Sequence, residues 1–72
     1  MINIAKYKKP KYKIGEMVYS YQNRNKPYPI NFIRESKDST YSHDYRLSLS
    51  NGNSNWISEK SIAKTKNAKK LN

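Results

Sequence analysis

The sequence contains no cysteine, one histidine and only two glycines among its 72 residues. Without cysteine the chain has no disulfide bond, no thiolate nucleophile and no zinc site built on sulfur ligands. A metal centre at His43 would need three carboxylates around it, and we expect none. The two glycines, Gly15 and Gly52, are too few for a glycine-rich phosphate loop. These shortages exclude most kinds of catalytic and cofactor site.

Acidic side chains are scarce as well, with five Asp and Glu in the whole chain. They are scattered, and no two have a spacing that indicates a general acid and base. Ser42, His43 and Asp44 are consecutive, but a catalytic triad needs side chains that converge from separate elements. We interpret His43 as a solvent-exposed loop histidine. We predict that the protein is not an enzyme and has no cofactor and no small-molecule substrate.

Long hydrophobic runs are also missing. Apolar residues make up 35% of the chain, and no stretch is long enough to span a bilayer. The first residues lack the hydrophobic run of a signal peptide. The expected helical turn is too short for a membrane-binding amphipathic helix. We therefore predict one small cytoplasmic domain without a membrane partner.

Positive charge is what the chain has in excess. Fifteen Lys and Arg face five Asp and Glu, which gives a net charge of +10. This excess of positive charge favours a polyanionic partner, with nucleic acid as the first choice and an anionic membrane surface as the second. The alternative is codon bias, because Lys, Asn, Ile and Tyr are abundant here and are encoded by AT-rich codons.

The charge is concentrated at the two ends of the chain. Residues 1–13 and 64–72 contain nine lysines and no acid, whereas residues 14–63 are close to neutral. We predict a basic N-terminal arm over 1–13, a β domain over 14–63 and a basic C-terminal tail over 64–72, with partly flexible tails. The arm either follows phosphates or is a solvated tail with surface tyrosines. Termini that lie close together would join the lysines into one patch.

The apolar pattern between the tails predicts short β-strands. Val18 and Ser20 share one face of the first strand. The clearest alternation is in the third strand, where Tyr45, Leu47 and Leu49 are expected to face inward and Arg46 and Ser48 outward. Pro27 and Pro29 argue against strand pairing and predict a polar loop. The adjacent pair Phe32 and Ile33 breaks alternation, which indicates a bulge. The expected strands are 17–21, 30–35, 45–50, 55–57 and 62–63, and the expected loops are 22–29 and 36–44.

The segment from residue 51 to residue 62 closes the predicted domain. Asn51-Gly52 is a strong hairpin signal, because both residues tolerate a positive φ. Ser58 is the expected N-cap of a helical turn at residues 59–61. We expect Trp56 to be buried in the core or to close the barrel, because a chain poor in apolar bulk needs its largest side chain for burial. Contact with a ligand is the alternative for Trp56.

Four motifs occur in an order that resembles the SH3-like small β-barrel, a group that includes Tudor, chromo-barrel and KOW-type domains. The resemblance covers residues 14–63 and implies a five-stranded barrel with one short 3-10 turn. Members of the group bind nucleic acids, Pro-rich or methylated peptides, or other proteins, so the fold does not choose a partner. The motifs are Ile14-Gly15-Glu16-Met17-Val18, Ile30-Asn31-Phe32-Ile33, Tyr45-Arg46-Leu47-Ser48-Leu49 and Trp56-Ile57-Ser58-Glu59-Lys60-Ser61-Ile62.

Two peptide-binding roles implied by the resemblance fit this sequence poorly. A Tudor-like cage for a methylated cation would use Tyr19, Tyr21 and Phe32. A strongly cationic chain is a poor host for such a ligand. Domains that bind Pro-rich peptides have an acidic loop near the groove, and the corresponding loop at residues 23–28 is basic.

We predict a binding module that contacts DNA or RNA mainly through phosphates, with low sequence specificity. Lysines of both tails and basic side chains of the domain supply the charge. Tyr19, Tyr21 or Trp56 would stack on bases. The expected nucleic-acid-binding residues are Lys6, Lys8, Lys9, Lys11, Lys13, Tyr19, Tyr21, Arg24, Lys26, Arg34, Arg46, Lys64, Lys66, Lys69 and Lys70.

Two other functions stay open. The first is a protein-interaction module, such as an accessory subunit or a small inhibitor of the kind that phages and mobile elements encode. In that case the near-neutral domain, not the tails, carries the affinity for a host protein. The second is a structural component of a ribonucleoprotein or virion whose tails become ordered only in the assembly.

Overall fold

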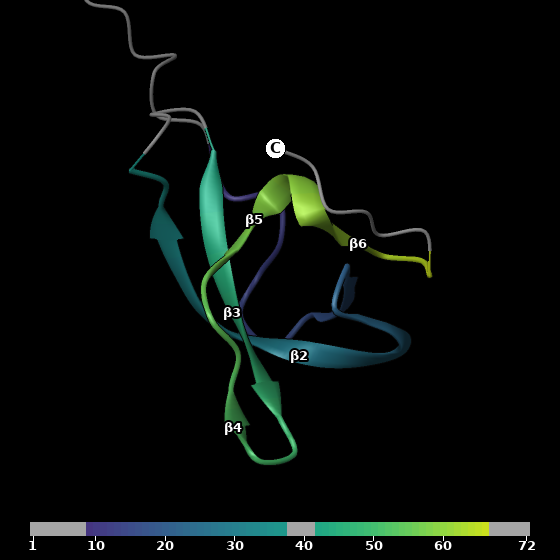
Figure 1. Ribbon diagram of the computed structural model, residues 1–72. Helices are drawn as coiled ribbons and strands as arrows, with labels where there is room; N and C mark the ends of the chain where they lie inside the picture. The colour runs from purple at the N-terminus through teal and green to yellow at the C-terminus, as the bar shows by residue number, and fades with distance from the viewer. Residues whose placement is uncertain (1–8, 38–41, 67–72) are drawn as a thin grey trace, which may run out of the picture.

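The computed structural model describes residues 9–37 and 42–66, which form an antiparallel all-β fold (Figure 1). The predicted all-β class is therefore confirmed. Among these residues no helix is both long and apolar enough to cross a membrane. The elements are β1 (Met17–Ser20), β2 (Asn23–Glu35), β3 (His43–Leu49), β4 (Gly52–Asn53), β5 (Ile57–Ser58), the 3-10 helix η2 (Glu59–Ser61) and β6 (Ile62–Ala63).

The strands form one six-stranded sheet in the order β4-β3-β2-β1-β6, with β5 paired to β3. Strand β6, the last strand, pairs with β1, the first. No pairing in the described part of the chain joins β6 to β4 or β5, so the sheet is open. The predicted closed barrel of five strands is not confirmed. The last three strands have two residues each and offer few backbone groups with which to close it.

Strand β2 shows that the predicted polar loop over residues 22–29 is wrong. The strand runs for 13 residues, through both Pro27 and Pro29, and crosses the whole molecule in Figure 1. Its first part pairs only with β1, and its second part pairs only with β3. A proline removes a backbone donor, which costs no ladder hydrogen bond where the donor side has no neighbouring strand. Both prolines lie in the part that has one neighbour.

A bulge interrupts β2 where the sequence predicted one. Ile30 pairs with Leu47 and Phe32 pairs with Arg46, so Asn31 is an extra residue on β2. Ile30 is buried, whereas Phe32 is 47% exposed. The extra residue therefore turns the second half of the strand so that Phe32 lies on the outer face.

Strand β3 has the clean alternation that the sequence indicated, but it begins before the predicted residue 45. His43, Tyr45 and Leu47 face inward and are buried. His43 is only 6% exposed, and its Nδ1 is buried without a hydrogen-bond partner among the described residues. The interpretation of His43 as a solvent-exposed loop residue is wrong, because strand alternation carries it to the core face.

The β3–β4 hairpin is confirmed, with its turn shifted by one residue. Leu49 pairs with Gly52, so the two-residue loop is Ser50-Asn51. Gly52, the first residue of β4, has a φ of +134°. An L side chain rarely adopts this conformation, which explains why glycine occupies the position.

The sequence predicted one fourth strand at residues 55–57. The structure has two shorter strands there, β4 and β5, separated by residues 54–56. The Ser54 amide donates to the Leu47 carbonyl at 2.9 Å, and the Leu47 amide donates to Ser54 Oγ at 2.9 Å. The buried Ser54 side chain thus takes the place of a backbone acceptor. It lies at the break between the β3–β4 and β3–β5 pairings.

The C-terminal part of the domain has the predicted N-cap, helical turn and last strand. Ser58 caps η2 by accepting a hydrogen bond from the Lys60 amide at 3.4 Å. Ile62 and Ala63 then pair with Ser20 and Tyr19 of β1.

The N-terminal arm contains a core residue that the sequence analysis did not anticipate. Tyr12 is only 4% exposed, and its ring meets the Tyr45 ring edge-on, with centroids 5.6 Å apart. Its hydroxyl donates to the Ile62 carbonyl at 3.2 Å. Aromatic burial of this kind dominates a small core. The core consists of Tyr12, Val18, Ile30, Tyr45, Leu47, Ile57 and Ile62.

Candidate nucleic-acid interface

Two arginines and two aromatic rings gather on the outer face of β2, β3 and the segment that joins β4 to β5. Phe32 on β2 is directly opposite Arg46 on β3. Trp56 immediately precedes the inward-facing Ile57 of β5, which pairs with Tyr45. Alternation therefore puts Trp56 on the same outer face as Arg46. We call Phe32, Arg34, Arg46 and Trp56 the arginine–aromatic face.

Arg46 lies between the two aromatic rings of this face. Its guanidinium carbon is 5.7 Å from the Phe32 ring centroid and 5.6 Å from the Trp56 ring centroid. Its Nε donates to the Ser54 carbonyl at 2.9 Å. These contacts are within the range of a cation–π interaction and fix the guanidinium between the rings.

Arg34 makes the closest contact with the tryptophan. Its guanidinium carbon is 4.3 Å from the Trp56 ring centroid, and its Nε donates to Asp44 Oδ2 at 3.1 Å. Asp44 is the cross-strand neighbour of Arg34. The carboxylate thus holds Arg34 over the indole and balances its charge, whereas Arg46 has no ion pair among the described residues.

The prediction that Trp56 is the core anchor is wrong. Trp56 is half-buried and does not belong to the core cluster. Tyr12 and Tyr45 provide the large rings of the core instead. The guanidinium groups of Arg34 and Arg46 lie over the Trp56 ring, and contact of Trp56 with a ligand stays a prediction.

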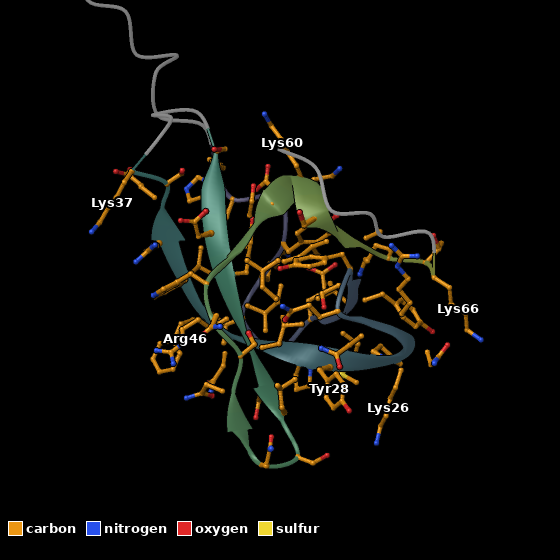
Figure 2. The ribbon with its side chains drawn as sticks, viewed as in Figure 1. Lys26, Tyr28, Lys37, Arg46, Lys60 and Lys66 are labelled. Carbon is orange, nitrogen blue, oxygen red and sulfur yellow. The ribbon has the colours of Figure 1, made fainter. Side chains whose placement is uncertain are left out.

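The predicted residues Arg24, Lys26, Tyr19 and Tyr21 lie apart from this face. Arg24 and Lys26 are exposed on β2, and the Lys26 ammonium is 5.5 Å from the Tyr28 ring centroid. In Figure 2, Lys26 and Arg46 lie on opposite sides of the molecule. Tyr21 packs against the core, and Tyr19 is half-buried on β1. The two tyrosines therefore do not join Trp56 in one aromatic surface.

The two basic ends of the domain meet at Glu16. The Lys64 ammonium forms an ion pair with the Glu16 carboxylate, and the Lys13 amide donates to Glu16 Oε1 at 2.9 Å. The hydrogen bond from Lys64, followed by that from the Lys13 amide, lowers the pKa of Glu16 below its ordinary value. Lys13 and Lys64 therefore contact the same carboxylate, and the expectation that the two tails form one patch stays a prediction.

The remaining predicted lysines divide into two groups. Lys9, Lys11, Lys13 and Lys66 are exposed. The other predicted positions, Lys6, Lys8, Lys69 and Lys70, lie outside the described residues.

The residues examined for catalysis do not converge. His43 faces the core, whereas Asp44 is on the opposite face of β3 and binds Arg34. No group of three His, Asp or Glu side chains within residues 9–37 and 42–66 is placed to hold a metal ion.

Arg34, Arg46 and Trp56 were predicted to contact nucleic acid, but not as one surface. Phe32 was considered only for a peptide cage. Alternation alone put Arg46 outside. The missing information was the phase of β2 after its bulge, which places Phe32 and Arg34 on the same side as Arg46. The spacing of Phe32 and Arg34, two residues apart, is the signal that was present.

The comparisons with known proteins give no relative on which to base a function. No protein-family model, no curated protein and no solved structure matches the chain.

Proposed function

We propose that the protein is a non-catalytic module that binds DNA or RNA through phosphates, with little sequence preference. The observation that carries the proposal is positive charge that the fold leaves unneutralised. The described residues form two ion pairs, Arg34–Asp44 and Lys64–Glu16. The exposed cations without an ion pair there are Lys9, Lys11, Lys13, Arg24, Lys26, Lys37, Lys60 and Lys66.

Of the four acidic side chains that the structure describes, three are bound internally, and Glu35 is exposed outside the two ion pairs. Glu16 and Asp44 are bound to cations. Glu59 accepts hydrogen bonds from the Tyr45 hydroxyl and from the Lys11 amide. One exposed carboxylate opposes eight exposed cations without an ion pair, so this surface attracts phosphates over a distance of about one Debye length, roughly 8 Å at physiological salt.

The fold suits this role, and we infer that it is an open relative of the SH3-like small barrel. The pairing of β1 with β6 and the 3-10 helix before the last strand support that inference. The group binds several kinds of partner, so the charge distribution, not the fold, argues for nucleic acid.

The test is a fluorescence-anisotropy titration of a labelled mixed-sequence oligonucleotide with the full chain. We expect binding at about 50 mM salt and at least tenfold weaker binding at about 200 mM salt, because released counterions drive the association. Replacing Lys6, Lys8, Lys69 and Lys70 with Gln should make the salt dependence less steep. Absence of binding at the lower salt concentration would refute the proposal.

A protein-interaction module is the second candidate. Ile14, three residues before β1, and Met17, its first residue, are 60% and 51% exposed. Exposed apolar side chains of this size are suited to a protein interface. A host protein bound there would be released by Ile14→Ser and Met17→Gln but retained by the four-lysine variant. Nucleic-acid binding should show the opposite pattern.

A further inference from the structure

The arginine–aromatic face has a geometry that phosphate attraction alone does not require. An arginine that only contacts phosphate needs its guanidinium free to project into solvent. Here both guanidinium groups lie against rings, Arg34 at 4.3 Å and Arg46 at 5.6 Å from the Trp56 centroid. Each is fixed through Nε, by Asp44 in one case and by the Ser54 carbonyl in the other. The planar groups are therefore held in place before any ligand arrives.

Phe32 adds an aromatic ring that is partly exposed to solvent. It is 47% exposed, whereas Ile30, just before the bulge, is 2% exposed. Among the residues described, Phe32 makes a cation–π contact with Arg46, whose guanidinium carbon is 5.7 Å from the ring centroid. A phenyl ring so exposed contributes little to folding and presents a flat apolar surface to solvent.

We propose that the arginine–aromatic face binds unpaired bases of a single nucleic-acid strand. The inference rests on the proposed nucleic-acid function and names its substrate class. Base planes stack on aromatic rings and on guanidinium planes, and the interaction tolerates any sequence because every base has a π-face. In a duplex these planes are already stacked on their neighbours. The face therefore selects single strands, while the exposed lysines attract either form through phosphates.

A protein ligand would also favour Trp, Arg and Phe, which are common in protein interfaces. The charge of the chain decides between the two ligands. Asp44 balances Arg34, but Arg46 has no ion pair within the described ranges, and the molecule has a net charge of +10. A polyanion that also offers planar groups matches both features of this face, so we argue for the nucleic acid.

The test compares a fluorescein-labelled oligothymidylate of about twelve nucleotides with a duplex of the same length. At low salt we expect the full chain to bind the single strand about tenfold more tightly than the duplex. Phe32→Leu keeps the charge and the apolar bulk but removes the aromatic plane. It should weaken single-strand binding about tenfold and change duplex binding less than about twofold. Met17→Leu, at another exposed apolar position, is the matched control and should change neither.

A second variant guards against an indirect effect of Phe32 on the fold. Arg46→Lys keeps the positive charge but loses the planar group, so it should also reduce the preference for single strands. If both variants retain the full preference, or if the wild-type chain binds both probes equally, the inference is wrong while the proposed function survives. If neither probe binds, both are wrong.

Discussion

The Tyr45 hydroxyl donates a hydrogen bond to Glu59 Oε1 at 2.6 Å. The same hydroxyl oxygen accepts from the amides of Lys11 and Tyr12, at 3.1 and 3.3 Å. One side chain of β3 thus ties the N-terminal segment to η2. This link explains why Tyr12, within a basic stretch, belongs to the core.

Tyr45→Phe should destabilise the domain by about 1–3 kcal/mol, because the amide of the buried Tyr12 loses its acceptor. Chemical denaturation measures the loss, and hydrogen exchange should be faster at the Lys11 and Tyr12 amides. Tyr19→Phe, on β1, is the matched control and should change stability by less than about 0.5 kcal/mol. Equal effects of the two variants would contradict the role given to Tyr45.

The same hydroxyl predicts an alkaline loss of stability. Burial, and then the hydrogen bond to Glu59, raise the pKa of Tyr45 above its ordinary value. The unfolded chain therefore loses this proton at a lower pH than the folded chain, and stability falls as the pH rises above about 10. The stability difference between wild type and Tyr45→Phe should shrink over that range. A difference that is constant up to about pH 11 would contradict this assignment.

The ion pair of Glu16 predicts that the stability of the fold depends on pH in the acidic range. Its pKa is lowered from the ordinary value of 4.5, first by the hydrogen bond with Lys64. A lowered pKa stabilises the fold above the unfolded value, and this contribution is lost as the pH falls through the folded value. The melting temperatures of wild type and Glu16→Gln should therefore converge below pH 4.5. Glu35→Gln, at an exposed acid outside both ion pairs, is the control for the loss of one negative charge.

Tyr12 and Trp56 should differ sharply in their effect on stability. Tyr12→Ala removes a buried core ring, which lowers the free energy of unfolding by about 3–5 kcal/mol. This loss is as large as the total stability of a small domain, so most molecules should be unfolded. Trp56→Ala removes a half-buried ring from the outer face and should cost less. Circular dichroism melting of both variants checks the order. A Trp56→Ala variant that is less stable than Tyr12→Ala would return Trp56 to the role of core anchor.

Features set by local chemistry were predictable from the sequence. The alternation of β3, the bulge before Phe32 and the Ser58 cap all follow from neighbouring residues. The continuation of β2 through Pro27 and Pro29 was not, because whether a proline breaks a strand depends on which side has a neighbour. That property belongs to the assembled sheet.

The candidate site was predictable only in part, for a similar reason. The size of Trp56 favoured burial, but size does not say which face a residue occupies. Trp56 lies on the outer face because the next residue, Ile57, faces inward and pairs with Tyr45. That pairing follows the irregular segment around Ser54. Tyr12 reached the core through Tyr45 and Ile62, 33 and 50 residues away in the chain, and no local pattern encodes such contacts.

The most direct test uses the only tryptophan as a reporter. Unlabelled oligothymidylate is added to the full chain at low salt while Trp56 fluorescence is recorded, and binding is followed separately by anisotropy. Bases stacked on the arginine–aromatic face should quench the fluorescence along the same binding curve, and about 200 mM salt should reverse most of the quenching. Binding seen by anisotropy without a change in Trp56 fluorescence would contradict the account.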